Sequence, residues 1–273
     1  MNTNLNKVFI FLILIISIIW LVVPFTMAIL WSLVDPSEPW TVDKLLPPVI
    51  SFYRWNYMWE NSNLKEALLN SYILAPSTAL FCLILSVPTS FAFGRLNFPG
   101  KEVAKLLTLL PIVLPPFVTS IYFSSILFEI GFEYWKFGNV LIAHVVLFIP
   151  FSIRIMTVCF EQVKQDVIDA ARDLSASKIE VFKVAYFPSL KSGVFASILI
   201  VFILSIEEFA IAFIIGAPDF ITIPTILYSA LGQDFVRPNA AVISLILVFP
   251  NVILMIFLER VLRSANPGLI SGK

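Results

Sequence analysis

Long uncharged runs of apolar residues restrict the folds that are open to this chain. Between Lys7 and Asp35 there are 27 uncharged residues, and between Glu66 and Arg95 there are 28. A helix needs about 20 mainly apolar residues to cross the hydrocarbon core of a bilayer, so each run is long enough to span it. Hydrophobic residues make up 59% of the chain, charged residues 13%, and the mean hydropathy is +0.94. Soluble domains are far less apolar, and we therefore expect an integral membrane protein.

The charged residues divide the chain into six predicted membrane helices. The predicted helices cover residues 8–33, 70–94, 106–128, 138–159, 193–215 and 239–258. Prolines lie within several of these ranges, and membrane helices tolerate them where neighbouring helices satisfy the freed carbonyls. We therefore predict an all-α fold, with the six helices packed as a bundle in one transmembrane domain, residues 1–273. The first run is too long for a cleaved signal peptide.

Basic residues predict the orientation of this bundle. If the N-terminus is cytoplasmic, the cytoplasmic side holds 13 of the 18 Lys and Arg residues. Because cytoplasmic loops carry the excess of these residues, we expect both termini in the cytoplasm. Two long segments then remain outside the bilayer, an external one near 34–69 and a cytoplasmic one near 160–191.

Several classes of function are disfavoured by what the chain lacks. A net charge of zero gives no support for nucleic-acid binding. His144 is the only histidine, so a site with two histidine ligands cannot form, and we expect no metal site and no catalytic residues. The phosphate-binding pattern G-x-x-x-x-G-K-[ST] is missing, so ATP would have to bind another chain. These absences disfavour an enzyme, and we expect no cofactor on this chain.

The cytoplasmic segment has the pattern of two short helices. Apolar residues along the first recur at helical spacing and form one stripe, made of Val163, Val167, Ala170, Ala171 and Leu174. Ser177 and Glu180 fit a capping box that begins the second helix. Pro188 should end that helix near Tyr186. The pattern alone leaves open whether the stripe packs on this chain or on a partner.

The same segment resembles the EAA loop of the membrane subunits of binding-protein-dependent ABC importers. Residues 169–171, Asp-Ala-Ala, correspond to Glu-Ala-Ala in the family, and Ser175 stands where the family has a Gly six residues after the Glu. Phe187 and Pro188 correspond to a Leu-Pro pair. Asp169, Ser175 and Phe187 depart from the pattern, and Ser175 tolerates a left-handed backbone less well than Gly.

Other stretches extend the resemblance over nearly the whole chain. Residues 91–100 resemble the sugar-importing branch, and residues 268–273 are similar to the glycine-rich tail of maltose-type permeases. Residues 171–174 and 205–209 resemble the polyamine-importing branch instead. The resemblance implies a maltose-type permease fold. It favours a sugar, a polyol or a related small polar solute, with a polyamine as the alternative.

The resemblance also implies an assembly in the inner membrane, surrounded by lipid. A second permease subunit would pair with this one, and an external binding protein would deliver the solute. Two ATPase subunits, carrying ATP and Mg, would dock on the coupling residues, which are Val167, Asp169, Ala170, Ala171, Leu174 and Ser175. A secondary transporter working alone would have no need of such a docking segment. A structural membrane protein would not need acids buried in its helices and would not co-purify with an ATPase.

Polar residues within the apolar ranges are the candidates for a solute path. Glu207 and Glu208 lie in the fifth range, where a charge is costly unless it faces a partner or a wet cavity. They could line the path, or they could form an ion pair, a cap or a helix break. His144 is interpreted as a hydrogen-bonded packing residue, and Arg154 as a residue that reaches the interface. The apolar external loop 217–238 could be an interfacial loop with a short helix near 225–231. By the resemblance, it could instead be the loop that reaches toward the binding protein.

Overall fold

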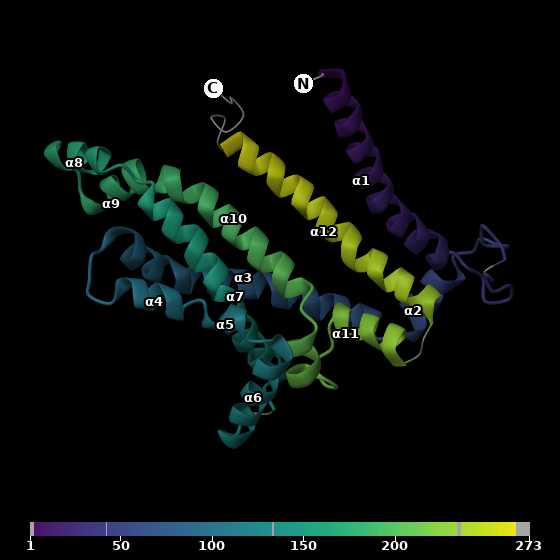
Figure 1. Ribbon diagram of the computed structural model, residues 1–273. Helices are drawn as coiled ribbons and strands as arrows, with labels where there is room; N and C mark the ends of the chain where they lie inside the picture. The colour runs from purple at the N-terminus through teal and green to yellow at the C-terminus, as the bar shows by residue number, and fades with distance from the viewer. Residues whose placement is uncertain (1–2, 42, 133, 234–235, 266–273) are drawn as a thin grey trace. The chain divides into compact units, whose positions relative to one another are not determined.

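The computed structural model describes residues 3–41, 43–132, 134–233 and 236–265, which are helical over most of their length (Figure 1). The chain divides into two compact units, which are described separately below. Unit 1 comprises Met1–Lys65 and Ile226–Phe249, and unit 2 comprises Glu66–Thr225 and Pro250–Lys273. The all-α membrane fold predicted from the sequence is confirmed. That the chain forms one transmembrane domain stays a prediction.

Unit 1 contains the first helix and the long segment that follows it. Helix α1 covers Thr3–Ser32 and α2 covers Tyr53–Asn61, while α12 begins at Arg237 and continues to Ala265. An isolated antiparallel bridge pairs Val34 with Ile50 and closes the intervening loop. Arg54 Nη1 lies 3.4 Å from Asn239 Oδ1 and joins α2 to α12. The segment predicted to be external is therefore folded rather than extended.

Three long helices form the centre of unit 2. They are α3 (Leu64–Arg95), α7 (Lys136–Glu161) and α10 (Phe187–Ile206), and α10 lies along α7 (Figure 1). A buried chain of hydroxyl groups links them, because Ser152 Oγ on α7 lies 2.6 Å from Ser86 Oγ on α3 and 2.6 Å from Ser197 Oγ on α10. Such bonds hold helices together within a bilayer, where apolar side chains gain little by leaving lipid.

Small residues let these helices approach closely at two crossings. A Cβ at Gly94 on α3 would lie 2.7 Å from Phe160 Cβ on α7, and a Cβ at Gly193 on α10 would overlap Cys159 Sγ on α7. Each glycine therefore sits where the backbone of one helix touches a side chain of the next. The contact distance between α7 and its two neighbours depends on these positions.

The third predicted helix, 106–128, is bent rather than continuous. It is formed by α4 (Lys101–Leu107), α5 (Leu110–Val113) and α6 (Pro116–Glu129), with a bend of 97° before Pro116. Pro111, Pro115 and Pro116 fall within six residues, and each removes a backbone donor and crowds the preceding turn. The described residues contain five helices long and apolar enough to span, or six if this bent pair counts as one.

The fifth predicted helix differs at both of its ends. It ends at Ile206 rather than near 215, and a π-helix, η2 (Ala212–Gly216), follows the break. At its other end, α10 continues from α9 (Lys178–Val181) through a π-helix, η1 (Phe182–Tyr186), so the predicted end near Tyr186 is wrong. Pro188 lies in the first turn of α10, where its missing donor costs least, and the π-helix changes the hydrogen-bond register just before it.

The short helix predicted near 225–231 is confirmed. Helix α11 covers Ile223–Tyr228, and the π-helix η3 continues it over Ser229–Gln233. Two side chains of α3 hold the start of this region, since Asn70 Nδ2 donates to Ile221 O at 2.9 Å and Ser71 Oγ accepts from Ile223 N at 3.0 Å. The loop before α11 is thus fixed to unit 2 by α3.

Replacing Gly193 by Ala should destabilise the contact between α7 and α10. The added methyl group would overlap Cys159 Sγ, and overpacking of this kind typically costs about 1–3 kcal/mol. We expect a lower melting temperature for the purified protein in detergent. Adding Cys159→Ala removes the obstructing sulfur and should recover a large part of the loss. A double variant no more stable than Gly193→Ala would show that the crossing does not depend on this contact.

Candidate functional site

The predicted coupling residues lie on α8 (Gln165–Asp173) and in the turn that follows it. Helix α8 packs on its own chain through Ile168, which is fully buried, and through the half-buried Ala171. These side chains contact a small cluster that includes Val163, Val181 and Ala185. Ile168 was absent from the predicted stripe, although it is the residue of α8 that anchors the helix to this chain.

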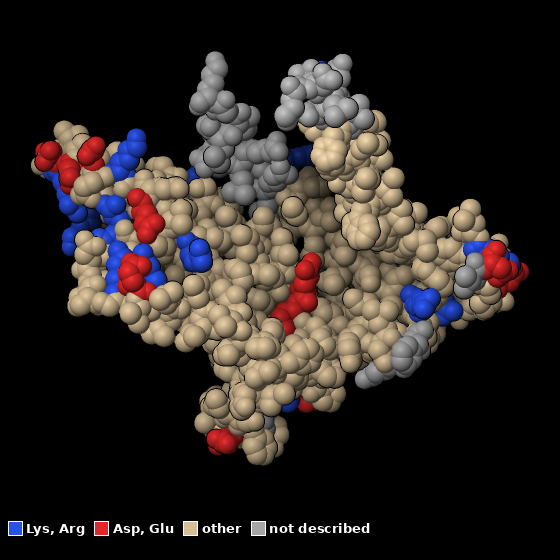
Figure 2. All heavy atoms as spheres, in the orientation of Figure 1, with Lys and Arg blue, Asp and Glu red and all other residues tan. Residues whose placement is uncertain are grey.

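The rest of the stripe faces away from the protein. Leu174 is 84% exposed, and Val167 and Ala170 are also exposed. Ile179 and Val184, in the helical segment that follows α8, also have exposed side chains. Figure 2 shows basic and acidic groups gathered at the end of unit 2 where Figure 1 places α8 and α9. The amphipathic helix thus has one apolar face on its own chain and a second one that no described residue covers.

Ser175 shapes the turn between α8 and α9. Its φ of 59° is left-handed, the conformation that favours Gly. Ser175 N donates to Arg172 O at 2.8 Å, and Ala176 N donates to Ala171 O at 3.1 Å. These two bonds form a Schellman motif that closes the end of α8. The tight break is therefore kept with Ser at the position where the resemblance expects Gly.

Side chains from two helices fix the start of α8. Arg95, the last residue of α3, donates from Nη1 to Val163 O at 3.0 Å and from Nη2 to Gln165 Oε1. Gln165 Nε2 in turn donates to Asp169 Oδ1 at 2.9 Å. The predicted coupling residue Asp169 is thus held by its own helix, through a chain of bonds that begins on α3. Arg95 and Gln165 were not predicted, because their contact joins residues that are far apart in the sequence.

The second acid, Glu208, lies in the break after α10, where two backbone amides and a histidine contact its carboxylate. Its carboxylate accepts from Ile211 N at 2.9 Å and from Ala212 N at 3.3 Å, so it caps the start of η2. Its Oε2 lies 3.3 Å from Nε2 of the fully buried His144, whose Nδ1 lies 2.8 Å from Ser205 Oγ. His144 is a hydrogen-bonded packing residue, as predicted, and Glu208 has the geometry of an ion pair and a cap.

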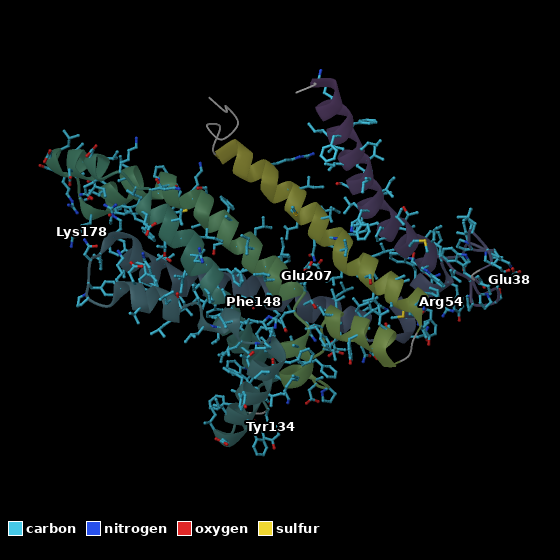
Figure 3. The ribbon with its side chains drawn as sticks, in the orientation of Figure 1. Glu38, Arg54, Tyr134, Phe148, Lys178 and Glu207 are labelled. Atoms are coloured by element: carbon cyan, nitrogen blue, oxygen red, sulfur yellow. The ribbon has the colours of Figure 1, made fainter. Side chains whose placement is uncertain are left out.

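Glu207 has a different environment. It is exposed, and its side chain makes no ion pair or hydrogen bond within the described part of the chain. Figure 3 labels it at the end of α10, and Figure 2 shows an isolated acidic group on an uncharged surface in that region. The structure thus separates the two adjacent acids, one held within the protein and one free to meet a ligand or a partner.

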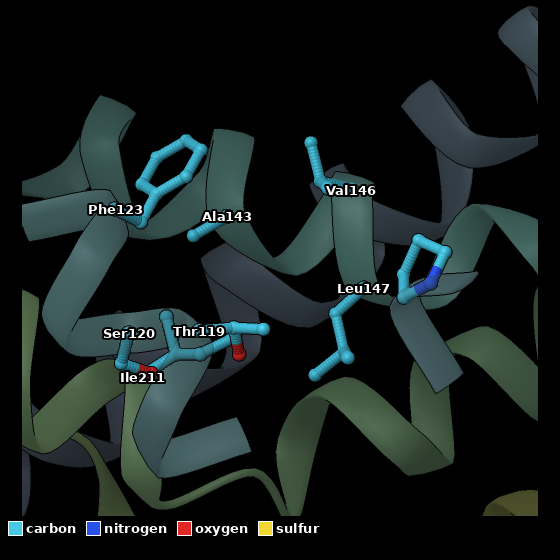
Figure 4. A pocket seen from close by; sticks show the side chains of 8 residues that line it. Thr119, Ser120, Phe123, Ala143, Val146, Leu147 and Ile211 are labelled. Atoms are coloured by element: carbon cyan, nitrogen blue, oxygen red, sulfur yellow. The ribbon is translucent and has the colours of Figure 1, made fainter. Parts of the chain in front are cut away.

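A pocket near this break lies between α5, α6, α7 and Ile211, the residue before η2 (Figure 4). Its volume is about 40 Å³, room for little more than a water molecule and far below the roughly 300–1,000 Å³ of small-molecule sites. The hydroxyls of Thr119 and Ser120 already donate to Pro116 O, at 2.9 and 2.6 Å. The pocket is a packing gap beside the bent helix. Because both hydroxyls already donate to the backbone, neither has a hydrogen left to donate to a solute.

Replacing Ser175 by Gly should stabilise the turn that ends α8. Gly relieves the left-handed strain of a side chain, which is worth about 1 kcal/mol. We expect amide hydrogen exchange across 165–180 to slow by roughly fivefold. Ser175→Ala is the matched control, because it removes the hydroxyl, keeps the Cβ and should leave exchange unchanged. Equal exchange in the Gly variant and the native chain would contradict the strain argument.

Comparison with known proteins places this geometry in a family. Residues 86–267 match the family described as binding-protein-dependent transport system inner membrane component. The match covers the segment predicted to be the coupling loop and both acids, and it extends over more than half of the chain. The chain therefore belongs to this family and is a multi-pass protein of the inner membrane.

Individual relatives are distant and differ in their solutes. The trehalose transport system permease protein SugB of Mycobacterium tuberculosis (strain CDC 1551 / Oshkosh) is 23% identical over 239 residues, 84% of this chain and 85% of the relative. The spermidine/putrescine transport system permease protein PotC of Escherichia coli (strain K12) is 21% identical over 214 residues, 78% of this chain and 80% of the relative.

A solved structure shares the fold. A chain of a bacterial ABC transporter involved in the import of the acidic polysaccharide alginate superposes with a TM-score of 0.76 at 16% identity. The superposition covers 94% of this chain and 96% of that one. The protein thus has the fold of an ABC importer permease.

Proposed function

We propose that this permease subunit moves a small polar organic solute across the inner membrane, driven by ATP hydrolysis on separate subunits. The observation that carries the proposal is the uncovered apolar face of α8, formed by Val167, Ala170 and Leu174. A face of this kind at a rigidly closed helix end suits a groove on a partner protein. The assembly would include a second permease subunit, two ATPase subunits and an external binding protein.

Rigid support of α8 favours a coupling role over a loose surface helix. Ile168 anchors one side of the helix, Arg95 and Gln165 hold its start, and Ser175 closes its end. A helix held at three places can transmit a displacement, whereas a mobile one would absorb it. A secondary transporter working on an ion gradient would gain nothing from such a structure.

The solute we favour is a sugar, a polyol or a related polar compound. Similarity to a trehalose permease and the fold shared with an alginate importer support this class. A polyamine is the second candidate, and a specific observation favours it. Glu207 presents a free carboxylate, which suits a cationic solute, and a spermidine/putrescine permease is also among the relatives.

Replacing Ala170 by Trp tests the coupling proposal. Ala170 is exposed, so the bulky group leaves the packing of α8 on its own chain intact and holds a partner surface away. Overpacking a fitted contact costs about 1–3 kcal/mol, a roughly five- to hundredfold loss in a docking equilibrium. We expect less ATPase retained on the purified permease and less solute-stimulated hydrolysis in proteoliposomes.

Two variants on the same helix serve as controls for this test. Ala171→Trp should also lower the stability of α8, because Ala171 packs against the cluster of Val163, Val181 and Ala185. Asp166→Asn changes an exposed side chain outside the apolar face and should leave ATPase retention unchanged. Full retention and normal coupling in Ala170→Trp would refute the docking role of this face.

Replacing the two acids one at a time should separate transport from assembly. Glu208→Ala removes the carboxylate that contacts His144 and accepts from two backbone amides. Each buried group left without a partner costs about 1–3 kcal/mol, so yield and melting temperature should fall. Glu207→Gln should leave both unchanged and lower uptake in proteoliposomes, most of all if the solute is a cation. Normal uptake by Glu207→Gln would remove that acid from the solute path.

A further inference from the structure

A second, larger pocket opens in unit 2 where α3 and α7 meet α8, α9 and η1. Its volume is about 610 Å³, within the range of small-molecule sites. We call it the aromatic pocket, and the side chains that define it are Phe91, Phe160, Phe182, Tyr186, Arg172 and Lys178. It is not a gap in the packing, because Phe182 is 47% exposed and leaves one side of the pocket open.

The two ends of the aromatic pocket differ in chemistry. One end is apolar and is formed by Val87, Pro88 and Phe91 of α3. Val87 precedes the helix end at Arg95 by eight residues, about 12 Å along the axis, so this end lies within the uncharged part of α3. The other end carries the cations Arg172 and Lys178, which flank the turn between α8 and α9.

The two cations at that end are not held in close ion pairs by the described residues. Lys178 forms no ion pair with any described residue, and the pair of Arg172 with Asp169 is long, at 3.8 Å, and exposed. An exposed pair of this kind contributes little, so the guanidinium remains available to another anion. A third cation adjoins the pocket, since Arg95 Cζ lies 5.9 Å from the centre of the Tyr186 ring.

We propose that the aromatic pocket binds an anionic phospholipid, with its phosphate at Arg172 and Lys178 and its chains against Val87, Pro88 and Phe91. Basic pockets between membrane helices on the cytoplasmic side bind acidic lipid headgroups in this way. A segment of a soluble partner is the less suitable occupant, because it would have to enter the apolar depth of α3 to fill the inner end. The site would make the segment that carries the coupling residues sensitive to the lipid around it.

Native mass spectrometry tests this assignment on the full-length chain, purified with the subunits that stay bound to it. The probes are phosphatidylglycerol and phosphatidylethanolamine at equal concentration. We expect phosphatidylglycerol to be preferred, and the double variant Arg172→Gln, Lys178→Gln to lose roughly thirtyfold of that preference. Lys178→Gln alone changes one exposed side chain and should lose about fivefold, which keeps the test valid if the double variant folds poorly.

Matched controls separate this pocket from general positive charge. The pair Lys101→Gln, Lys183→Gln removes two cations that do not line the pocket and should keep the preference. Glycerol phosphate, a headgroup without chains, should not displace the lipid at the same concentration. Equal binding of both lipids, an unchanged preference in the double variant, or displacement by glycerol phosphate would each overturn the proposal. If the double variant lost bound ATPase but kept its lipid preference, the pocket would be assigned to a protein segment, and the lipid proposal would be overturned as well.

Discussion

The packing of α3 and α10 against α7 determines where every candidate residue of unit 2 lies. Ser152 is at the centre of this contact, bonded to hydroxyls on both neighbours, and Gly94 and Gly193 set how closely the helices approach. Within a bilayer, hydrogen bonds and small residues decide such contacts, because apolar side chains are equally well solvated by lipid. His144 extends from the same helix α7 toward the break after α10, and α8 follows directly after its end.

Run length and charge were sufficient to predict the membrane fold, but not the paths of individual helices. Pro88 and Pro150 lie inside continuous helices, whereas Pro111, Pro115 and Pro116 bend one by 97°. Each proline lacks a backbone N–H donor. Whether the helix bends depends on how many prolines fall within two turns and on which neighbours satisfy the freed carbonyls. That information is tertiary, and the π-helix that carries the chain into Pro188 depends on it in the same way.

The segment predicted to be the coupling loop shows how much of a structure local sequence can predict. The capping box of Ser177 and Glu180 was predictable because its partners are three residues apart, and both of its bonds are present. Which face of α8 is buried was not predictable, because Ile168 and the stripe of Val167, Ala170 and Leu174 are all apolar. Only the position of the cluster around Val181 decides that Ile168 packs inward and Leu174 outward.

Continuity of the backbone joins the two candidate sites mechanically. No loop separates α9 from α10, since η1 carries the helix directly from Lys178 to Ile206, and Glu207 and Glu208 follow at its end. A displacement of α9 must therefore either deform η1 or move α10 along its contact with α7. At the far end, Glu208 lies 3.3 Å from His144 Nε2 on α7 and accepts from the amide of Ile211, so the break after α10 is tied to α7. Where η1 keeps its form, a displacement of α9 would reach the neighbourhood of Glu207 as a shift of α10 along α7.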